Sequence, residues 1–371
     1  MDIKKLIRPE LIAMKSYTPI EPTEVLSQEA ELPSGKIIKL DGNENPYGCS
    51  PKVYQALATY PYYHNYPDPE QRELRKALEK YTGLDREYIV CGTGSDELID
   101  LILRLFLNPG DEVINCPPTF GMYPFSTDIC GGRLVEVPRT EDFSLDITGM
   151  KQALTKRTKV IFVASPNNPT GNIASEKEIL ELVDAGKIVV VDEAYFEFSN
   201  VTVANLVPSY PNLIVLRTFS KWAGLAGLRI GYGIFPVDIA DYLMKIKQPY
   251  NASAAAQAAV LASLADIDYL RANVAKIIRE RARLFEKLKE IRWLSPYPSQ
   301  ANFILCQVVV TQSETKKKQS LAKEIWQQLR KRGIFVRYFD TPLLKDCLRV
   351  SVGKPEDTDA LIEALKEVKH G

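Results

Sequence analysis

The sequence predicts an α/β protein in which helices cover both faces of a large, mostly parallel sheet, followed by a smaller α+β unit. Between residues 88 and 216, short continuous apolar runs alternate with helical segments, which is the pattern of strands buried on both faces. After about residue 248 this pattern gives way to a long helical stretch and a further set of strands and helices. The length of 371 residues also favours two packed units over one small domain.

An N-terminal arm and two domains follow from this pattern. Residues 1–35 are polar and irregular, so we expect an arm that packs with the small domain. The large domain is predicted over residues 36–250, and its strands at residues 37–40, 88–91, 112–116, 133–137, 159–164, 188–191 and 213–216. Residues 95–106 and 176–183 are predicted helices between these strands. The small domain is predicted over residues 251–371, with a helical stretch at 252–288 that is broken near Asp266 and strands at 301–306, 334–339 and 348–352.

The composition argues against several classes of protein. The formal net charge is zero, so we expect neither nucleic acid nor an anionic membrane as a partner. No apolar run approaches the ~20 residues that a membrane-spanning helix needs, and the N-terminus lacks the apolar core of a signal peptide. Six cysteines without a CxxC pair and only two histidines argue against disulfides, a metal site and Ser-His-Asp catalysis. We therefore expect a cytoplasmic protein with reduced thiols.

The stretch at residues 218–233 carries the strongest chemical signal. Ser220 and Lys221 stand where the apolar run at residues 213–216 should end, and Arg229 follows in a glycine-rich setting. An amine that is shielded from water and lies near other cations loses its proton readily and becomes a nucleophile, able to condense with the aldehyde of a cofactor. A solvated loop lysine is the alternative, which this stretch alone does not exclude.

Polar or aromatic groups follow other predicted strands in the same way. They are Ser95, Asp96 and Glu97 at a glycine-rich helix start, Phe120, Asn168, and the pair Asp192 and Tyr195. The free N–H groups of a helix start can bind a phosphate. Each motif also has an ordinary explanation as a turn or a helix cap. However, the carboxyl ends of parallel strands share one edge of a sheet, where ligands bind, so we expect these groups to converge on Lys221.

Together these motifs closely resemble those of the fold type I pyridoxal-phosphate enzymes, in particular the histidinol-phosphate aminotransferases. The resemblance covers nearly the whole chain and includes Asn-Glu-Asn-Pro-Tyr-Gly at residues 43–48, Tyr-Pro-Asp-Pro at 66–69, Asn-Pro-Thr-Gly at 168–171 and Asp-Glu-Ala-Tyr at 192–195. It implies a three-layer large domain, the cofactor pyridoxal 5'-phosphate and a homodimer.

The resemblance also implies catalytic roles. Lys221 would hold the cofactor covalently and then act as general base. Asp192 would pair with the pyridinium nitrogen, which keeps the ring protonated. Asn168 and Tyr195 would hydrogen-bond the phenolic oxygen of the ring, and Phe120 would stack on its face.

A further set of residues would bind the cofactor phosphate. The resemblance assigns this role to Ser220, Arg229 and the N–H groups of Ser95, Asp96 and Glu97. Tyr66 would reach the phosphate bound in the neighbouring subunit, so each site would need a dimer.

Substrate contacts are implied for two arginines and one asparagine. Arg349 matches the arginine that binds substrate carboxylate, Arg337 matches one associated with substrate phosphate, and Asn45 lies in the Asn-Glu-Asn-Pro-Tyr-Gly loop. Arg337 could instead be the polar side of an alternating strand. The implied reaction is transamination between histidinol phosphate and 2-oxoglutarate, a step of histidine biosynthesis that forms imidazole acetol phosphate and glutamate.

Three other functions remain open at this point. A same-fold aromatic aminotransferase or a phosphothreonine decarboxylase would keep Lys221 and Asp192. A non-catalytic regulator built on the same domain would carry a DNA-binding segment ahead of it. The roughly 35 residues before the first predicted strand are not basic, which disfavours the regulator.

Overall fold

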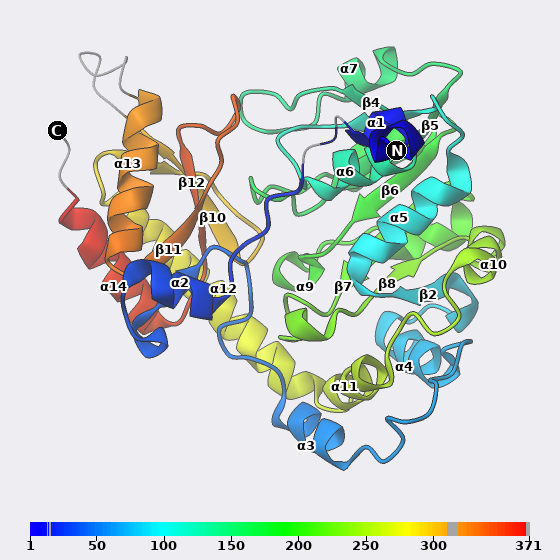
Figure 1. Ribbon diagram of the computed structural model, residues 1–371, viewed down its shortest axis with the longest axis horizontal. Coiled ribbons are helices and arrows are strands. Elements are labelled where there is room, and N and C mark those ends of the chain that lie inside the picture. The colour runs from blue at the N-terminus through cyan, green and yellow to red at the C-terminus, as the bar shows by residue number, and fades with distance from the viewer. Residues whose placement is uncertain (13, 15, 310–317, 369–371) are drawn as a thin grey trace.

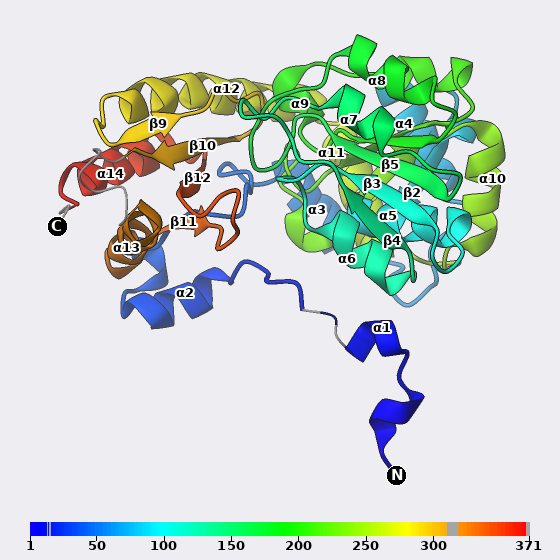
Figure 2. The ribbon, with the colours of Figure 1, turned by 90° about the horizontal axis from the view of Figure 1, so that it is seen from above.

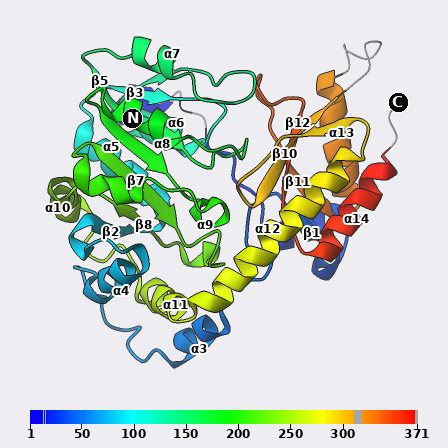
Figure 3. The ribbon, with the colours of Figure 1, turned by 180° about the vertical axis from the view of Figure 1, so that it is seen from behind.

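Two sheets organise the protein into a larger and a smaller unit, which Figure 1 shows on the right and on the left. The computed structural model describes residues 1–371 except 13, 15, 310–317 and 369–371. The helix α12 (Ile267–Lys289) runs from one unit to the other, as the view from behind in Figure 3 shows. The predicted fold class is confirmed.

The larger sheet has seven strands in the described part of the chain. Their order is β2 (Ile89–Gly92), β8 (Gly231–Ile234), β7 (Leu213–Thr218), β6 (Ile188–Asp192), β5 (Thr158–Ala164), β3 (Glu112–Asn115) and β4 (Arg133–Glu136). The strands from β7 to β4 pair in parallel, whereas β8 runs antiparallel to both of its neighbours. The strand β8 was not predicted, because its sequence is rich in glycine.

Helices cover both faces of this sheet because its strands are apolar on both sides. In β5, Val160 and Phe162 belong to one buried cluster, while Ile161 and Val163 belong to another. The first cluster packs under α5 (Gly94–Phe106), α6 (Met122–Ile129) and α10 (Val237–Ile246). The second packs under α4 (Arg72–Thr82), α7 (Ile147–Gln152) and α8 (Glu176–Val183). Figure 2 shows α6 and α8 on opposite sides of the sheet.

The central strands end at one edge of the sheet. Ala164 of β5 is opposite Asp192 of β6, which in turn is opposite Leu216 of β7. The segments that follow these three strands, with Asn168, Tyr195 and Lys221, therefore start side by side.

The smaller sheet corrects one prediction. Its order is β1 (Ile38–Leu40), β11 (Ile334–Tyr338), β12 (Cys347–Ser351), β10 (Phe303–Val308) and β9 (Leu294–Pro296). The strand predicted at residues 37–40 was assigned to the large domain, but β1 pairs in parallel with β11. An apolar strand can pair at either sheet, and sequence pattern alone does not select the partner. The domain limits at residues 35 and 250 stay a prediction.

Three helices pack around the smaller sheet, and the arm contacts both units. The helices are α12, α13 (Lys318–Lys331) and α14 (Pro355–Lys366). In the arm, Glu29 of α2 (Thr23–Ala30) pairs with Arg330, whereas Arg8, next to α1 (Pro9–Ile12), donates to the carbonyl of Ile129 at 2.5 Å. We expected the arm to pack with the small domain. Its second half, with α2, does so, whereas its first half contacts the larger unit.

Three further α-helices pack against α12 or against one another. They are α3 (Pro51–Thr59), α9 (Phe196–Ser199) and α11 (Ala254–Leu264). The predicted break near Asp266 is confirmed, because α11 ends at Leu264 and α12 begins at Ile267. Among the described residues, no helix is both long and apolar enough to cross a membrane.

Candidate active site

Lys221 lies just beyond β7, where the two units meet. Its Nζ donates to the carbonyl of Gly42 at 3.2 Å, in the loop that follows β1. Burial lowers the pKa of this amine to about 8, and the cations Arg349 and Arg229 contribute. About a tenth of the amine is therefore uncharged and nucleophilic at pH 7, far more than at the ordinary pKa of 10.5.

Asp192 is the buried carboxylate at the end of β6. Only 4% of the residue is exposed, and burial raises its pKa to about 6. The hydroxyl of Tyr123 donates to Oδ2 at 2.7 Å, and the N–H of Ala194 donates to Oδ1 at 3.1 Å. Both hydrogen bonds favour the charged form, so the carboxylate can serve as counter-ion to a cationic ring nitrogen.

Tyr195 connects the large unit to the loop after β1. Its hydroxyl accepts from Nδ2 of Asn43 at 3.0 Å, and burial raises its pKa to about 12. Asn43 has a left-handed backbone with φ of 54° and also bonds Ser351 of β12 through its N–H, at 2.9 Å. Nδ2 of Asn302 donates to the carbonyl of Asn43 at 2.9 Å. Asn43 thus fixes the tyrosine hydroxyl against the smaller sheet.

Arg349 brings the smaller sheet to Asn168. Its Nη1 donates to Oδ1 of Asn168 and its Nη2 to the carbonyl of Asp41, each at 2.5 Å. Burial lowers the pKa of the guanidinium to about 10. Its Nε is buried and has no hydrogen-bond partner among the described residues. An unpaired donor on a buried cation is suited to bind an anion.

A cradle for an anion lies at the start of α5. The first turn contains Ser95, Asp96 and Glu97, and the side chain of the N-cap residue Thr93 does not cap its N–H groups. Arg229 extends over this turn, with Nη2 at 2.7 Å from Oδ2 of Asp96 and Nη1 at 3.5 Å from Oγ of Ser220. The carboxylate of Glu97 instead accepts a hydrogen bond from the N–H of Thr93 at 2.5 Å. Glu97 can therefore contribute only its backbone N–H to the anion cradle.

Two glycines make this cradle possible. A Cβ at Gly94 would lie 2.7 Å from Nη2 of Arg229, and a Cβ at Gly231 would lie 2.8 Å from the N of Ser95. Gly94 also has φ of +73°, which disfavours other residues. Gly231 therefore lets two backbone segments approach closely at the start of α5, and Gly94 leaves room for the guanidinium of Arg229.

Phe120 and Tyr123 form the aromatic side of the site. Phe120 is half-buried and meets the ring of Tyr123 edge-on, at 5.7 Å between centroids and 85° between planes. The sequence predicted Phe120 but missed Tyr123, as it also missed Asn43, Ser351 and Asn302. Tyr123 lies inside a helix rather than at a strand end, so no pattern marked it.

Asn45 and Arg337, the two other residues predicted to contact substrate, each donate to a backbone carbonyl. Asn45 donates from Nδ2 to the carbonyl of Trp222 at 2.6 Å, and its Oδ1 accepts from the N–H of Tyr47 at 2.9 Å. Asn45 thus holds the backbone beside Lys221. Arg337 donates from Nη2 to the carbonyl of Thr18 at 3.0 Å, so the arm crosses the smaller sheet at this point.

Tyr66 is the predicted residue that points to solvent. It is 81% exposed, and its ring stacks on Tyr250 at 4.4 Å between centroids. In the described part of this chain, Tyr66 contacts neither Lys221 nor the anion cradle. This placement is the one expected if its target lies in another subunit.

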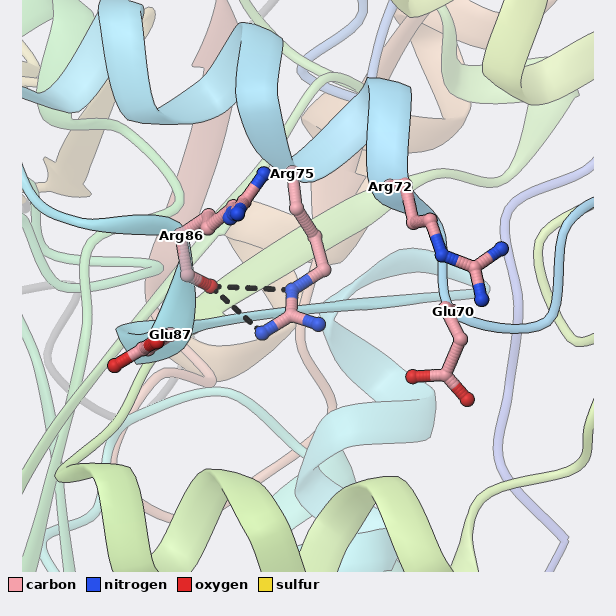
Figure 4. A pocket seen from close by; sticks show the side chains of 5 residues that line it. All are labelled: Glu70, Arg72, Arg75, Arg86 and Glu87. Atoms are coloured by element: carbon pink, nitrogen blue, oxygen red, sulfur yellow. Dashed lines mark hydrogen bonds between the residues drawn. The ribbon is translucent and has the colours of Figure 1, made fainter.

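A separate depression on α4 is lined by Glu70, Arg72, Arg75, Arg86 and Glu87 (Figure 4). Arg75 donates to the carbonyl of Arg86 at 2.8 and 3.1 Å. Arg72 pairs with Asp68 at 2.8 Å. This depression contains none of the strand-end residues, and its arginines largely bond to their own neighbours, so we do not take it as the active site.

Comparisons with known proteins identify the family. The aminotransferase class I and II family matches residues 35–365. A histidinol-phosphate aminotransferase of Dehalococcoides mccartyi is 52% identical over 367 residues, which cover 99% of each chain. A chloroplastic histidinol-phosphate aminotransferase of Arabidopsis thaliana is 48% identical over 363 residues, covering 97% of this chain and 85% of that protein.

A solved structure has the same fold. The crystal structure of a histidinol-phosphate aminotransferase from Sinorhizobium meliloti in complex with pyridoxal 5'-phosphate superposes with a TM-score of 0.87. It is 29% identical, and the match covers 97% of this chain and 96% of that one. The protein described here belongs to the class I and II aminotransferase family.

Proposed function

We propose that this protein transfers the amino group of histidinol phosphate to 2-oxoglutarate with pyridoxal 5'-phosphate as cofactor, in histidine biosynthesis. The observation that carries the proposal is Lys221, a shielded amine with a pKa lowered to about 8, at the sheet edge that also holds Asp192 and the anion cradle. The substrate follows from the relatives, which are named for this reaction and match the chain over nearly its full length.

The residues present fit the cofactor. The uncapped first turn of α5, with Ser220 and Arg229, would hold the phosphate. Asp192 would face the ring nitrogen, Tyr195 and Asn168 the ring oxygen, and Phe120 the ring face. When bound, pyridoxal phosphate supplies an electrophilic carbon for the amine and an electron sink during proton removal.

The protein's own groups then position the substrate and move the proton. Lys221 Nζ, whose lowered pKa makes the uncharged form accessible, accepts a proton from the substrate carbon and returns it during the exchange. Asp192 holds a negative charge away from water. Arg349, with its unpaired Nε, binds the carboxylate of 2-oxoglutarate.

Arg337 binds the phosphate of histidinol phosphate in this proposal. Its present acceptors are the neutral carbonyls of Thr18 and Pro19, at 3.0 and 3.4 Å. A phosphate oxygen is a stronger acceptor for guanidinium than a carbonyl oxygen, so substrate can replace these contacts. Asn45 contributes indirectly, because its side chain holds the backbone carbonyl of Trp222 beside Lys221.

We further propose that the enzyme works as a homodimer in the cytoplasm. The exposed ring of Tyr66 supports the dimer, because it projects from this chain and can reach a neighbouring subunit. The six cysteines are all free thiols, as a reducing compartment requires.

A comparison of three amino donors tests the proposed function. Purified protein with pyridoxal phosphate is incubated with 2-oxoglutarate and histidinol phosphate, phenylalanine or phosphothreonine, and glutamate and carbon dioxide are measured. We expect glutamate with the highest kcat/KM from histidinol phosphate. A preference for phenylalanine would assign an aromatic aminotransferase, and carbon dioxide from phosphothreonine would assign a decarboxylase.

A further inference from the structure

Two aromatic rings pack against the buried ring of Tyr123, whose hydroxyl bonds to Asp192. The residue is fully buried, and its ring stacks on Phe162 of β5 at 4.6 Å and 5°. The ring of Phe120 meets the ring of Tyr123 edge-on. The backbone carbonyl of Tyr123 accepts a hydrogen bond from Oγ1 of Thr127 at 2.7 Å. The hydroxyl of Tyr123 donates a hydrogen bond to Oδ2 of Asp192 at 2.7 Å.

We propose that Tyr123 is a positioning residue for the reaction, which holds Asp192 charged and aimed at the cofactor ring through this hydrogen bond. The inference rests on the proposed function, because it assigns Asp192 the role of counter-ion to the ring nitrogen. The alternative is a core tyrosine whose hydroxyl merely needs a buried partner.

The charges around Asp192 explain why this one hydroxyl matters. Asp96 from α5 and Glu193 from the end of β6 both disfavour a charged Asp192, in addition to burial. Asp192 also acts electrostatically on Tyr195 and adds to burial in raising the pKa of that hydroxyl. The hydrogen bond from Tyr123 is the largest influence that opposes burial, followed by the N–H of Ala194.

The hydroxyl also stays a donor over the working pH range. Burial and the charge of Asp192 raise the pKa of Tyr123 well above its ordinary value of 10.0. Tyr123 therefore does not ionise, and the proton between the two groups remains on the tyrosine whenever Asp192 is charged.

The test measures the pKa of Asp192 in cofactor-free protein, by carboxyl 13C NMR with the resonance assigned through its loss in Asp192→Asn. Removal of a hydrogen bond to a charged group should raise this pKa by about one unit or more in Tyr123→Phe. Tyr81→Phe is the matched control, because Tyr81 is another tyrosine that donates to an enclosed carboxylate, Oε1 of Glu197 at 3.0 Å. It should leave the pKa of Asp192 unchanged.

A second substitution keeps the test decisive if Tyr123→Phe folds poorly. Trifluorotyrosine at position 123 keeps the ring and carries a more acidic hydroxyl, so it should lower the pKa of Asp192. In the loaded enzyme, the acid limb of the kcat profile should move up in pH for Tyr123→Phe and down for trifluorotyrosine.

An unchanged pKa of Asp192 in both position-123 proteins, or an equal shift in Tyr81→Phe, would overturn the inference. These titrations need neither cofactor nor substrate. They therefore stand apart from the donor comparison, whose failure would remove the proposed function and leave the Tyr123–Asp192 coupling intact.

Discussion

Arg337 and Arg349 lie directly opposite each other on β11 and β12. Their guanidinium carbons are 5.7 and 5.6 Å from the centroid of the same ring, that of Phe339. The charge of Arg337 adds to burial in lowering the pKa of Arg349 to about 10. Two cations held on one face of a strand pair, despite mutual repulsion, gain from an anionic ligand that contacts both.

Arg337→Ala should selectively impair the phosphorylated donor. We expect kcat/KM for histidinol phosphate to fall on the order of 100-fold, because a charge-assisted contact to phosphate is lost. An unphosphorylated aromatic donor should lose much less. Arg332→Ala is the control, because Arg332 also donates to a backbone carbonyl in the smaller unit, that of Ala364 at 2.8 Å. Equal losses for both donors in Arg337→Ala would show that Arg337 supports the fold.

The lowered pKa of Lys221 should be visible as amine reactivity. In cofactor-free protein, labelling of Lys221 by an amine-selective reagent should rise with pH and level off above about 8. Mass spectrometry of the peptide that contains Lys221 measures this labelling. Arg349→Met removes a neighbouring cation, so the midpoint should move to higher pH. A midpoint near the ordinary value of 10.5 in the wild type would contradict the proposed environment.

Subunit mixing should reveal whether Tyr66 serves a neighbouring site. Tyr66→Ala and Lys221→Ala proteins are each expected to be impaired, but a mixed dimer would contain one site with both groups. We therefore expect partial recovery of activity after mixing. The double variant mixed with wild type is the control, since each hybrid site then lacks Tyr66 or Lys221. No recovery despite demonstrated exchange would mean that Tyr66 acts within its own chain or has no role.

Sequence pattern located the parts of the site that stand at strand ends, because those ends share a sheet edge. Lys221 and Asp192 are there, and Asn168 and the start of α5 are beside them. The pattern missed Tyr123, because that residue reaches the site from within a helix, and it gave no role to Asn43, although Asn43 opens the loop motif at residues 43–48. It also placed the strand at residues 37–40 in the wrong sheet, because apolar character does not specify a pairing partner.

Glu197 should make stability depend on pH. Its Oε1 accepts from Tyr81 and its Oε2 is buried without a partner among the described residues. Burial raises the pKa of this carboxyl from the ordinary 4.5 to about 8. The folded state therefore holds the proton more tightly, and this stabilisation is present below 4.5 and is lost as pH rises through about 8.

Glu197→Gln removes this dependence and should raise the Tm by several degrees more at pH 8.5 than at pH 5, measured by thermal unfolding. Glu181→Gln is the control, because Glu181 is an exposed partner of Lys151 at 2.9 Å and should change little at either pH. A Tm change for Glu197→Gln that is the same at both values would contradict a protonated, buried Glu197.

Isotope labelling of the donor shows whether Lys221 transfers the amino group of histidinol phosphate to 2-oxoglutarate. Histidinol phosphate labelled with 15N in its amino group is incubated with 2-oxoglutarate, pyridoxal phosphate and either wild-type or Lys221→Ala protein. We expect 15N-glutamate in proportion to the donor consumed with the wild type, and none with Lys221→Ala. Unlabelled or absent glutamate with the wild type, or undiminished transfer without Lys221, would contradict this expectation.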